Sequence, residues 1–171
     1  MAIRTILHYP DKRLREHGKR VEKITPEIQR LVDDMAETMY AAPGVGLAAT
    51  QIGEAVQIFV IDIAEQDQPS DLRVFINPEI LERVDEVTWN EGCLSFPGVT
   101  EEIDRAAKVR VRAQDRDGKW FELEAEGLLA VAIQHENDHL QGVLMIDKLG
   151  PLKRRILDRK MKKRAEERAA P

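Results

Sequence analysis

The sequence predicts an α+β fold, with small antiparallel or mixed β-sheets around a central helix and a further helix at the C-terminus. Two segments, residues 26–42 and 127–141, carry apolar residues at helical spacing. The segments between them alternate apolar and polar residues, or form short apolar runs, as β-strands do. Short turns join neighbouring strands, without the regular strand–helix–strand order that is typical of a parallel sheet.

The first helix is expected to begin after Thr25, since threonine is a favoured N-cap residue and Pro26 suits the first helical turn. It should end near Ala42, because a Pro-Gly pair follows. Residues 44–51 (GVGLAATQ) are mostly small. Another backbone can therefore approach this segment closely.

Four segments are expected to form strands. Residues 58–63 are an almost continuous apolar run, typical of a buried strand, and residues 73–80 follow as a second strand. Residues 108–112 and 119–123 alternate apolar and polar side chains, and the DRDG sequence between them favours a hairpin turn. The helix over residues 127–141 comes next and ends at a glycine.

The composition excludes several classes of protein. Of the 171 residues, 43% are hydrophobic and 33% charged, and no apolar run reaches the roughly 18 residues that a membrane helix needs. Aromatic residues make up only 5%, which argues against a nucleic-acid surface that stacks bases. The single cysteine cannot form an internal disulfide, and residues 1–14 lack the apolar stretch of a secretory signal. We therefore expect a cytoplasmic protein that binds neither a membrane nor DNA.

Charge is unevenly distributed along the chain. A proline at position 151 is expected to begin a third helix, in which residues 153–168 include nine basic and three acidic side chains. Since the whole chain has a net charge of −5, the preceding part is an acidic body. The basic run is consistent with a docking element for phosphate groups, and equally with a solvated helix face.

The strongest local signal is the HENDH sequence at residues 135–139, an H-E-x-x-H motif on the second expected helix. Residues four apart lie on one helical face, so His135 and His139 can bind one metal ion with Glu136 beside it as a base. At the composition of this chain, about 0.01 such motifs are expected by chance. The alternative is a pair of hydrogen-bonded histidines in the core.

A catalytic metal site needs a third protein ligand and one open coordination position. No histidine follows the motif, and Met145 occupies the position of the third histidine in the metzincin pattern. His8 and His17 lie in a charged segment that we expect to be exposed. Asp147 is a candidate ligand, but Cys93 is the better one, because a thiolate binds divalent transition metals strongly. The alternative for the cysteine is a small buried apolar residue.

Three motifs occur in order along the chain: GVGLAATQ at residues 44–51, EGCLS at 91–95 and QHENDHL at 134–140. Together they resemble the motifs of peptide deformylase, and the resemblance, closest to the bacterial type I branch, extends over nearly the whole chain. It implies an enzyme that removes the formyl group from the N-terminal formyl-methionine of nascent polypeptides and releases formate. It also implies that residues 1–150 form the catalytic domain, with residues 151–171 as an appended basic helix of the same domain.

The resemblance also implies roles for single residues. The implied metal ligands are Cys93, His135 and His139. Glu136 is the implied general base and acid, while Gln51 and the backbone N–H of Leu94 are implied to stabilise the oxyanion. The other implied site residues contact the peptide or line a methionine pocket: Val45, Gly46, Trp89, Glu91, Gly92, Leu128, Val131 and Ala132. The alternative for the apolar members of this set is ordinary core packing.

The resemblance implies one divalent metal ion, with Fe²⁺ expected in the cell. The intrinsic affinity of a mixed nitrogen and sulfur site would favour Zn²⁺, Ni²⁺ or Co²⁺ as substitutes. The C-terminal helix is implied to dock on the ribosome near the exit of the nascent chain, as in some type I relatives. Two other functions stay open: an H-E-x-x-H metallopeptidase that cleaves internal bonds, and a binding module with a structural metal and an RNA-contacting tail.

Overall fold

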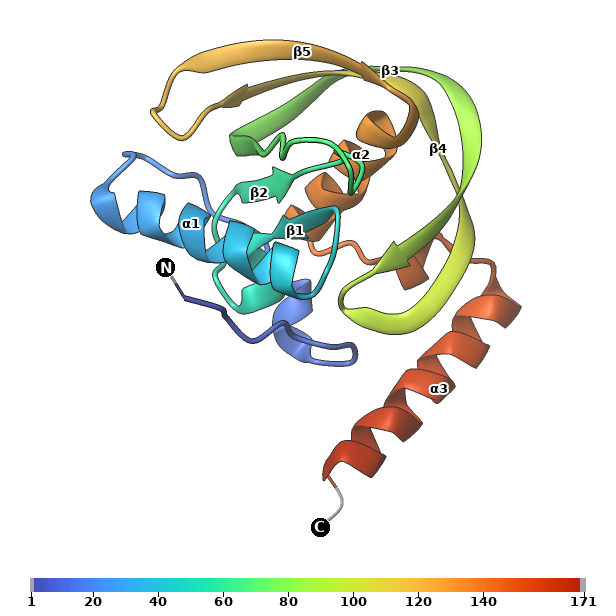
Figure 1. Ribbon diagram of the computed structural model, residues 1–171. Helices are drawn as coiled ribbons and strands as arrows, with labels where there is room; N and C mark the ends of the chain where they lie inside the picture. The colour runs from blue at the N-terminus through green and yellow to red at the C-terminus, as the bar shows by residue number, and fades with distance from the viewer. Residues whose placement is uncertain (1, 170–171) are drawn as a thin grey trace.

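Helices and strands of the computed structural model form an α+β arrangement, which confirms the predicted fold class (Figure 1). The structure describes residues 2–169. Within these residues, five strands form one sheet in which strand order follows the chain and every neighbouring pair is antiparallel. The strands are β1 (Gly46–Ala48), β2 (Ile58–Ile61), β3 (Arg73–Cys93), β4 (Phe96–Gln114) and β5 (Trp120–Glu126). The α-helices are α1 (Pro26–Ala41), α2 (Gly127–Leu140) and α3 (Pro151–Ala169).

Strands β3 and β4 are much longer than predicted. The strand expected over residues 73–80 continues to Cys93, and the one expected over 108–112 begins at Phe96. Their pairing register shifts twice between residues 76 and 82 of β3. Such bulges interrupt the apolar–polar alternation from which a strand is predicted. Figure 1 shows the long β3–β4 pair curving around α2.

Helix α1 begins and ends close to the predicted positions. Its N-cap is Thr25, whose Oγ1 accepts a hydrogen bond from the N–H of Ile28 at 3.2 Å. Its apolar face is buried against β1 and β2 in a core cluster that includes Val32, Met35 and Leu47. This packing holds β1 in place, and with it one edge of the sheet.

Helix α2 is the central helix and lies within the curve of the sheet (Figure 1). Its residues Ala130 and Ile133 are fully buried, in one cluster with Phe59, Phe75 and Val111 of the sheet. The two phenylalanine rings stack with their centroids 4.7 Å apart. Because α2 is so deeply buried, each polar side chain that points inward from it needs a partner or a ligand.

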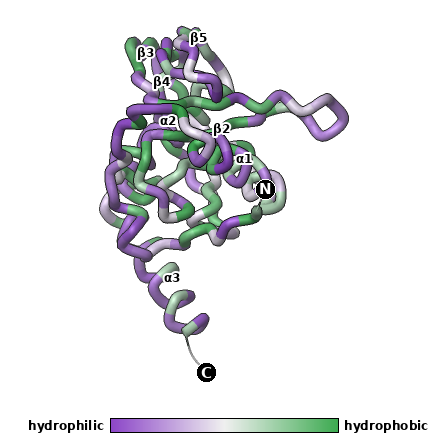
Figure 2. The backbone as a smooth tube through the Cα atoms, turned by 90° about the vertical axis from the view of Figure 1, so that its left-hand side faces the viewer, coloured by the Kyte–Doolittle hydropathy of each residue, from purple (hydrophilic) through white to green (hydrophobic). Residues whose placement is uncertain are grey.

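Helix α3 packs on the body through one narrow face. Leu157 and Met161 are buried with Leu7, Leu14 and Phe96, whereas most of its other side chains are exposed. Figure 2 shows α3 extending from one end of the molecule as a mainly hydrophilic segment. It corresponds to the predicted C-terminal helix, of which residues 170 and 171 lie outside the described residues. Across residues 2–169, the helices lack the length or the apolar character needed to span a membrane.

Gly142, which follows α2, should not tolerate a side chain. Its φ is +72°, and an added Cβ would lie 2.6 Å from the carbonyl oxygen of Arg15. Gly127 has a φ of +64° but no atom within 4 Å of an added Cβ. We expect Gly142→Ala to lower the free energy of unfolding by about 3 kcal/mol, through backbone strain and overpacking, and Gly127→Ala by about 1 kcal/mol, through strain alone. Denaturant titration measures both values, and equal losses would contradict the steric contribution.

Candidate active site

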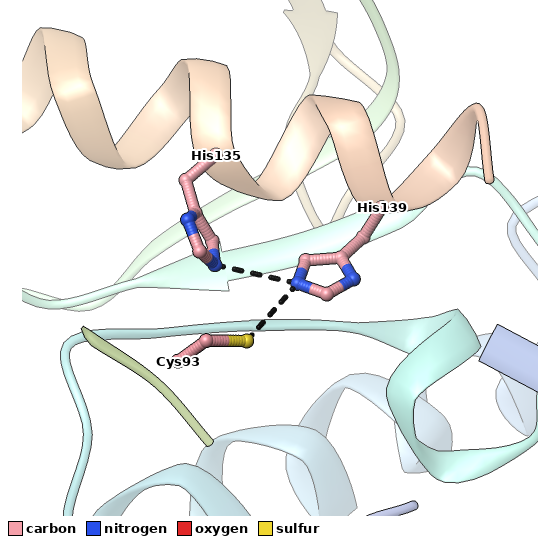
Figure 3. A group of neighbouring side chains, drawn as sticks. All are labelled: Cys93, His135 and His139. Carbon is pink, nitrogen blue, oxygen red and sulfur yellow. Dashed lines mark hydrogen bonds between the residues drawn. The ribbon is translucent and has the colours of Figure 1, made fainter. Parts of the chain in front are cut away.

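Cys93, His135 and His139 meet between the end of β3 and helix α2 (Figure 3). The two histidines lie one turn apart on α2, as the H-E-x-x-H spacing predicts. Their Nε2 atoms are 3.3 Å apart, and Sγ of Cys93 is 3.4 Å from Nε2 of His139. The structure thus brings the three predicted metal ligands together.

The spacing of these atoms fits a tetrahedral divalent ion. With bonds of about 2.05 Å to nitrogen and about 2.3 Å to sulfur, tetrahedral angles place two nitrogens about 3.3 Å apart, and nitrogen and sulfur about 3.6 Å apart. Burial lowers the pKa of His139 well below its ordinary value. The resulting neutral imidazole is the form that binds a metal. Three protein ligands also leave one coordination position for water or substrate, as in catalytic zinc sites.

A buried ion pair orients His135. Nδ1 of His135 lies 2.9 Å from Oε1 of Glu91, and a proton held there leaves Nε2 free to bind a metal. Glu91 also accepts two hydrogen bonds from Arg105, at 2.8 and 2.9 Å, and Arg105 donates a third to Asp138 on α2 at 2.5 Å. Substrate contact for Glu91, which the family resemblance implies, stays a prediction, and its carboxylate also binds Arg105 and lies beside Nδ1 of His135. Its side chain therefore supports His135.

Two of these residues, Arg105 and Asp138, were not predicted from the sequence. Arg105 is only 6% exposed and points inward from β4, on the face that also carries the buried Ile103 and Val109. An arginine on an otherwise apolar strand face is a signal for a buried acidic partner. Burial alone would raise the pKa of Glu91, but Arg105 and His135 outweigh it and hold the pKa below its ordinary value. The ion pair therefore remains charged at neutral pH.

Glu136 lies beside the metal ligands and faces β1. It is 5% exposed, and burial raises its pKa to about 7. Its Oε1 has no hydrogen-bond partner within residues 2–169. A Cβ built on Gly46 would lie 2.5 Å from its Oε2, so only glycine at position 46 leaves room for this carboxylate. A carboxyl group with a pKa near 7 can accept and return a proton at neutral pH.

Gln51 is held with its amide nitrogen toward Cys93. Its Oε1 accepts a hydrogen bond from the N–H of Ala48 at 2.9 Å. Its Nε2 donates to Oγ of Ser95 at 3.0 Å and lies 3.7 Å from Sγ of Cys93. Leu94 directly follows Cys93 in the β3–β4 turn. Both predicted oxyanion donors are therefore next to the metal ligands, and both residues line the groove beside them.

This groove has a volume of about 630 Å³. Residues 42–46 line it, as do residues 92–94 and 96–100 of the β3–β4 hairpin. His135 and Glu136 are also part of its lining. The segment of small residues and the cysteine motif, which lie far apart in the sequence, thus border one binding groove.

The exposure of His8 differs from the prediction. It is half-buried and lines the groove, whereas the charged sequence around it predicts an exposed side chain. The cause is a long-range contact: the N–H of Tyr9 donates to the carbonyl of Ser95 at 2.9 Å, which holds the N-terminal segment against the β3–β4 turn. His17 is exposed, as predicted.

A smaller pocket of about 220 Å³ adjoins the groove. Val45, Gly92, His135 and Glu136 line both, so the two spaces meet at the H-E-x-x-H motif. The five residues predicted to form an apolar pocket all line this one: Val45, Trp89, Leu128, Val131 and Ala132. Asn90 is a further lining residue, which was not predicted. Such a pocket suits an apolar side chain of a ligand that lies in the groove.

Comparison with known proteins gives one consistent answer. Residues 3–155 match the family model described as polypeptide deformylase. The peptide deformylase of Chromobacterium violaceum is 51% identical over 167 residues, which are 98% of this chain and 99% of the relative. Peptide deformylase 1 of Burkholderia multivorans is 53% identical over 164 residues, which are 95% of this chain and 90% of the relative.

Solved structures agree with the sequence comparison. The crystal structure of a peptide deformylase from Legionella pneumophila has a TM-score of 0.91 and 48% identity to this chain, and the match covers 99% of both chains. The peptide deformylase from Ehrlichia chaffeensis in complex with actinonin has a TM-score of 0.91 and 38% identity, over 96% of this chain and 98% of that chain. Since the family model and these relatives extend over nearly all of its length, this enzyme belongs to the peptide deformylase family.

Proposed function

We propose that the protein is a metal-dependent hydrolase that removes the formyl group from the N-terminal formyl-methionine of nascent polypeptides and releases formate. The observation that carries this proposal is the cluster of Cys93, His135 and His139, with Glu136 beside it, where the groove meets the apolar pocket. A groove of about 630 Å³ is within the usual range for ligand sites. Family membership supports deformylase activity.

Glu136 is the general base and acid of the proposed reaction. A divalent ion bound by the three ligands supplies Lewis acidity, which polarises a carbonyl and lowers the pKa of water. The unpaired Oε1 of Glu136 takes the proton from the water that attacks the formyl carbon. With a pKa of about 7, the same carboxyl group then gives this proton to the nitrogen of the leaving amine.

Negative charge that develops on the formyl oxygen needs donors that are already in place. Nε2 of Gln51 is one proposed donor, because the Ala48 N–H holds the amide in the required orientation. The backbone N–H of Leu94 is the other. Each donor would lower the barrier by about 3 kcal/mol.

The substrate backbone is proposed to bind at the edge of the sheet. Within residues 2–169, strand β1 lies at that edge and pairs only with β2, and Val45 and Gly46 line the groove. A peptide can add to a free edge as a further strand. Main-chain hydrogen bonds then bind it independently of its side chains. Gly92 offers its backbone from the other side of the groove. The methionine side chain then enters the smaller pocket.

Iron is the proposed metal in the cell, with Zn²⁺, Ni²⁺ or Co²⁺ as substitutes. A thiolate with two imidazoles suits all four ions, so the ligands alone do not select one. The proposed ferrous state and the thiolate of Cys93 are both sensitive to oxidation. A reducing cytoplasm is the proposed location because it protects both.

The ribosome, near the exit of the nascent chain, is the proposed partner of α3. The observation that favours it is the exposed basic side chains that α3 carries away from its docked face, among them Lys153, Arg155, Arg159, Lys160 and Lys163. Such side chains can contact RNA phosphates without disturbing the buried Leu157 and Met161. Docking there would bring the enzyme to its substrate.

Two other functions would use these residues differently. A metallopeptidase would cleave internal peptide bonds and would not prefer formylated substrates. A binding module with a structural metal and an RNA-contacting tail would need no general base and would have a closed set of four ligands. Within residues 2–169, the ligand cluster has three members.

We expect Glu136→Ala to retain the metal but to release formate about 10³-fold more slowly, because the general base is lost and the ligands are kept. Formate release from formyl-Met-Ala-Ser, measured together with the metal content, checks this expectation. Glu124→Ala, which removes an exposed carboxylate on β5, is the control and should keep the wild-type rate.

Absence of formate from metal-loaded wild-type protein would refute the proposed function, and cleavage of internal bonds instead would favour the metallopeptidase. Metal analysis of protein prepared without oxygen tests the proposed ion. Iron bound near one equivalent per chain supports it, and zinc alone contradicts it.

We expect Glu91→Gln to weaken metal binding by about 10- to 100-fold, because Nδ1 of His135 loses its carboxylate partner. Competition with a chelator, at a temperature where both proteins are folded, measures the affinity. Glu86→Gln alters an exposed residue of the same strand and should leave the affinity unchanged. An unaltered affinity in Glu91→Gln would show that His135 needs no support from this side chain.

We expect the combined variant Arg155→Glu, Arg159→Glu and Lys163→Glu to lose salt-sensitive binding to ribosomes, because its exposed charges are reversed. Co-sedimentation with ribosomes at low and high salt measures the binding. Formate release from formyl-Met-Ala-Ser should stay at the wild-type level. Unchanged sedimentation would reject the proposed partner.

A further inference from the structure

The β3–β4 hairpin has an irregular tip beside the metal ligands. Cys93 pairs with Phe96, but the next residue back on β3, Gly92, pairs with Thr100. Residues 97–99 of β4 therefore have no counterparts on β3 and form a bulge. Gly98 within this bulge has a φ of +75°.

This bulge forms part of the groove wall. Residues 96–100 line the groove, together with Cys93 and Glu136. None of residues 96–100 lines the smaller pocket that is proposed for the methionine side chain. With formyl-methionine placed at the metal ligands and in that pocket, the rest of the peptide must follow the groove. The position of the bulge therefore affects how the peptide residues after the methionine bind.

Ladder hydrogen bonds to β3 cannot hold residues 97–99 in place, because these residues are out of register. A hydrogen bond from α3 does so instead: Nη1 of Arg164 donates to the carbonyl oxygen of Pro97 at 2.7 Å. The same nitrogen lies 4.0 Å from the position of a Cβ on Gly98. A charged donor forms a stronger hydrogen bond than a neutral one.

Further contacts hold α3 against the hairpin tip. Phe96 and Val99 pack with Leu157 and Met161 of α3 in one buried cluster. The ring of Tyr9 stacks on Phe96 with centroids 5.0 Å apart, and its hydroxyl donates a hydrogen bond to Asp158 of α3. Arg164 is thus a half-buried side chain on an anchored helix, and it contacts the bulge through the carbonyl oxygen of Pro97.

We propose that Arg164 is a positioning residue for substrate binding: it holds the bulge at residues 97–99 so that the groove accepts the peptide beyond formyl-methionine. Within the described residues, no side chain of α3 lines the groove, so α3 acts on the substrate through this backbone contact. The inference rests on the proposed deformylase function. It gives α3 a role in substrate affinity, separate from any docking by its exposed face.

Steady-state kinetics of Arg164→Met on two peptides, formyl-Met-Ala and formyl-Met-Ala-Ala-Ala, test the proposal. Methionine keeps an unbranched apolar side chain at position 164 but removes the nitrogen that donates a hydrogen bond to Pro97. We expect KM for the longer peptide to rise about tenfold, the effect of losing one charge-assisted hydrogen bond, with kcat unchanged. KM for the shorter peptide should not change. Arg164→Lys, which restores a charged donor, should recover most of the affinity.

Glu166→Met is the control, since it alters an exposed residue of the same helix that has no proposed role. It should behave as wild type on both peptides. An equal rise in KM for both peptides, a fall in kcat alone, or no effect of Arg164→Met would each overturn the proposal.

Amide hydrogen exchange gives a readout that is independent of activity. We expect faster exchange at residues 96–100 in Arg164→Met than in wild type or Glu166→Met. Unchanged exchange there would overturn the positioning role even if the kinetics changed. If wild type released no formate from either peptide, the proposed function would fail, and exchange would still decide whether Arg164 holds the bulge.

Discussion

The buried guanidinium of Arg105 joins the three elements that carry the metal ligands and their support. Arg105 lies on β4, its partner Glu91 lies on β3, and its second partner Asp138 lies on α2. Loss of one member of such a buried ion pair leaves an uncompensated charge, which costs far more than loss of a surface pair. Because Glu91 also holds Nδ1 of His135, the same interaction fixes the helix against the sheet and orients a predicted metal ligand.

Regular parts of the fold carry the ligand cluster of the site, and irregular parts form the walls of its groove. The ligands and Glu136 lie on α2 and at the end of β3, where packing and hydrogen bonds limit their movement. The groove walls come instead from a short edge strand and from a bulged hairpin tip. The proposed chemistry needs fixed distances among a few atoms, whereas binding of varied peptides needs mainly an accessible backbone.

Local patterns in the sequence predicted much of this site. The H-E-x-x-H spacing places two predicted ligands and the proposed base on one helix, because residues four apart along a helix lie on the same face. The third predicted ligand, Cys93, lies 46 residues before His139, so only family resemblance or the folded chain could bring it into the candidate site. The sequence alone could not predict that Arg105 pairs with Glu91. That prediction needs the register of β3 and β4, and bulges interrupt the alternation from which a register is inferred. The half-burial of His8 likewise depends on a contact with the distant β3–β4 turn.

The short length of β1 affects whether copies of this protein can pair through their strand edges. A free strand edge that accepts peptides of many sequences can also pair with the edge of another folded sheet, which is a route to aggregation. β1 offers only the residues Gly46–Ala48, and the hairpin tip lies across the groove from it. The proposed substrate is a single extended chain, whereas the edge of a folded neighbour brings further strands with it. The short edge thus limits the backbone that another folded sheet could pair with.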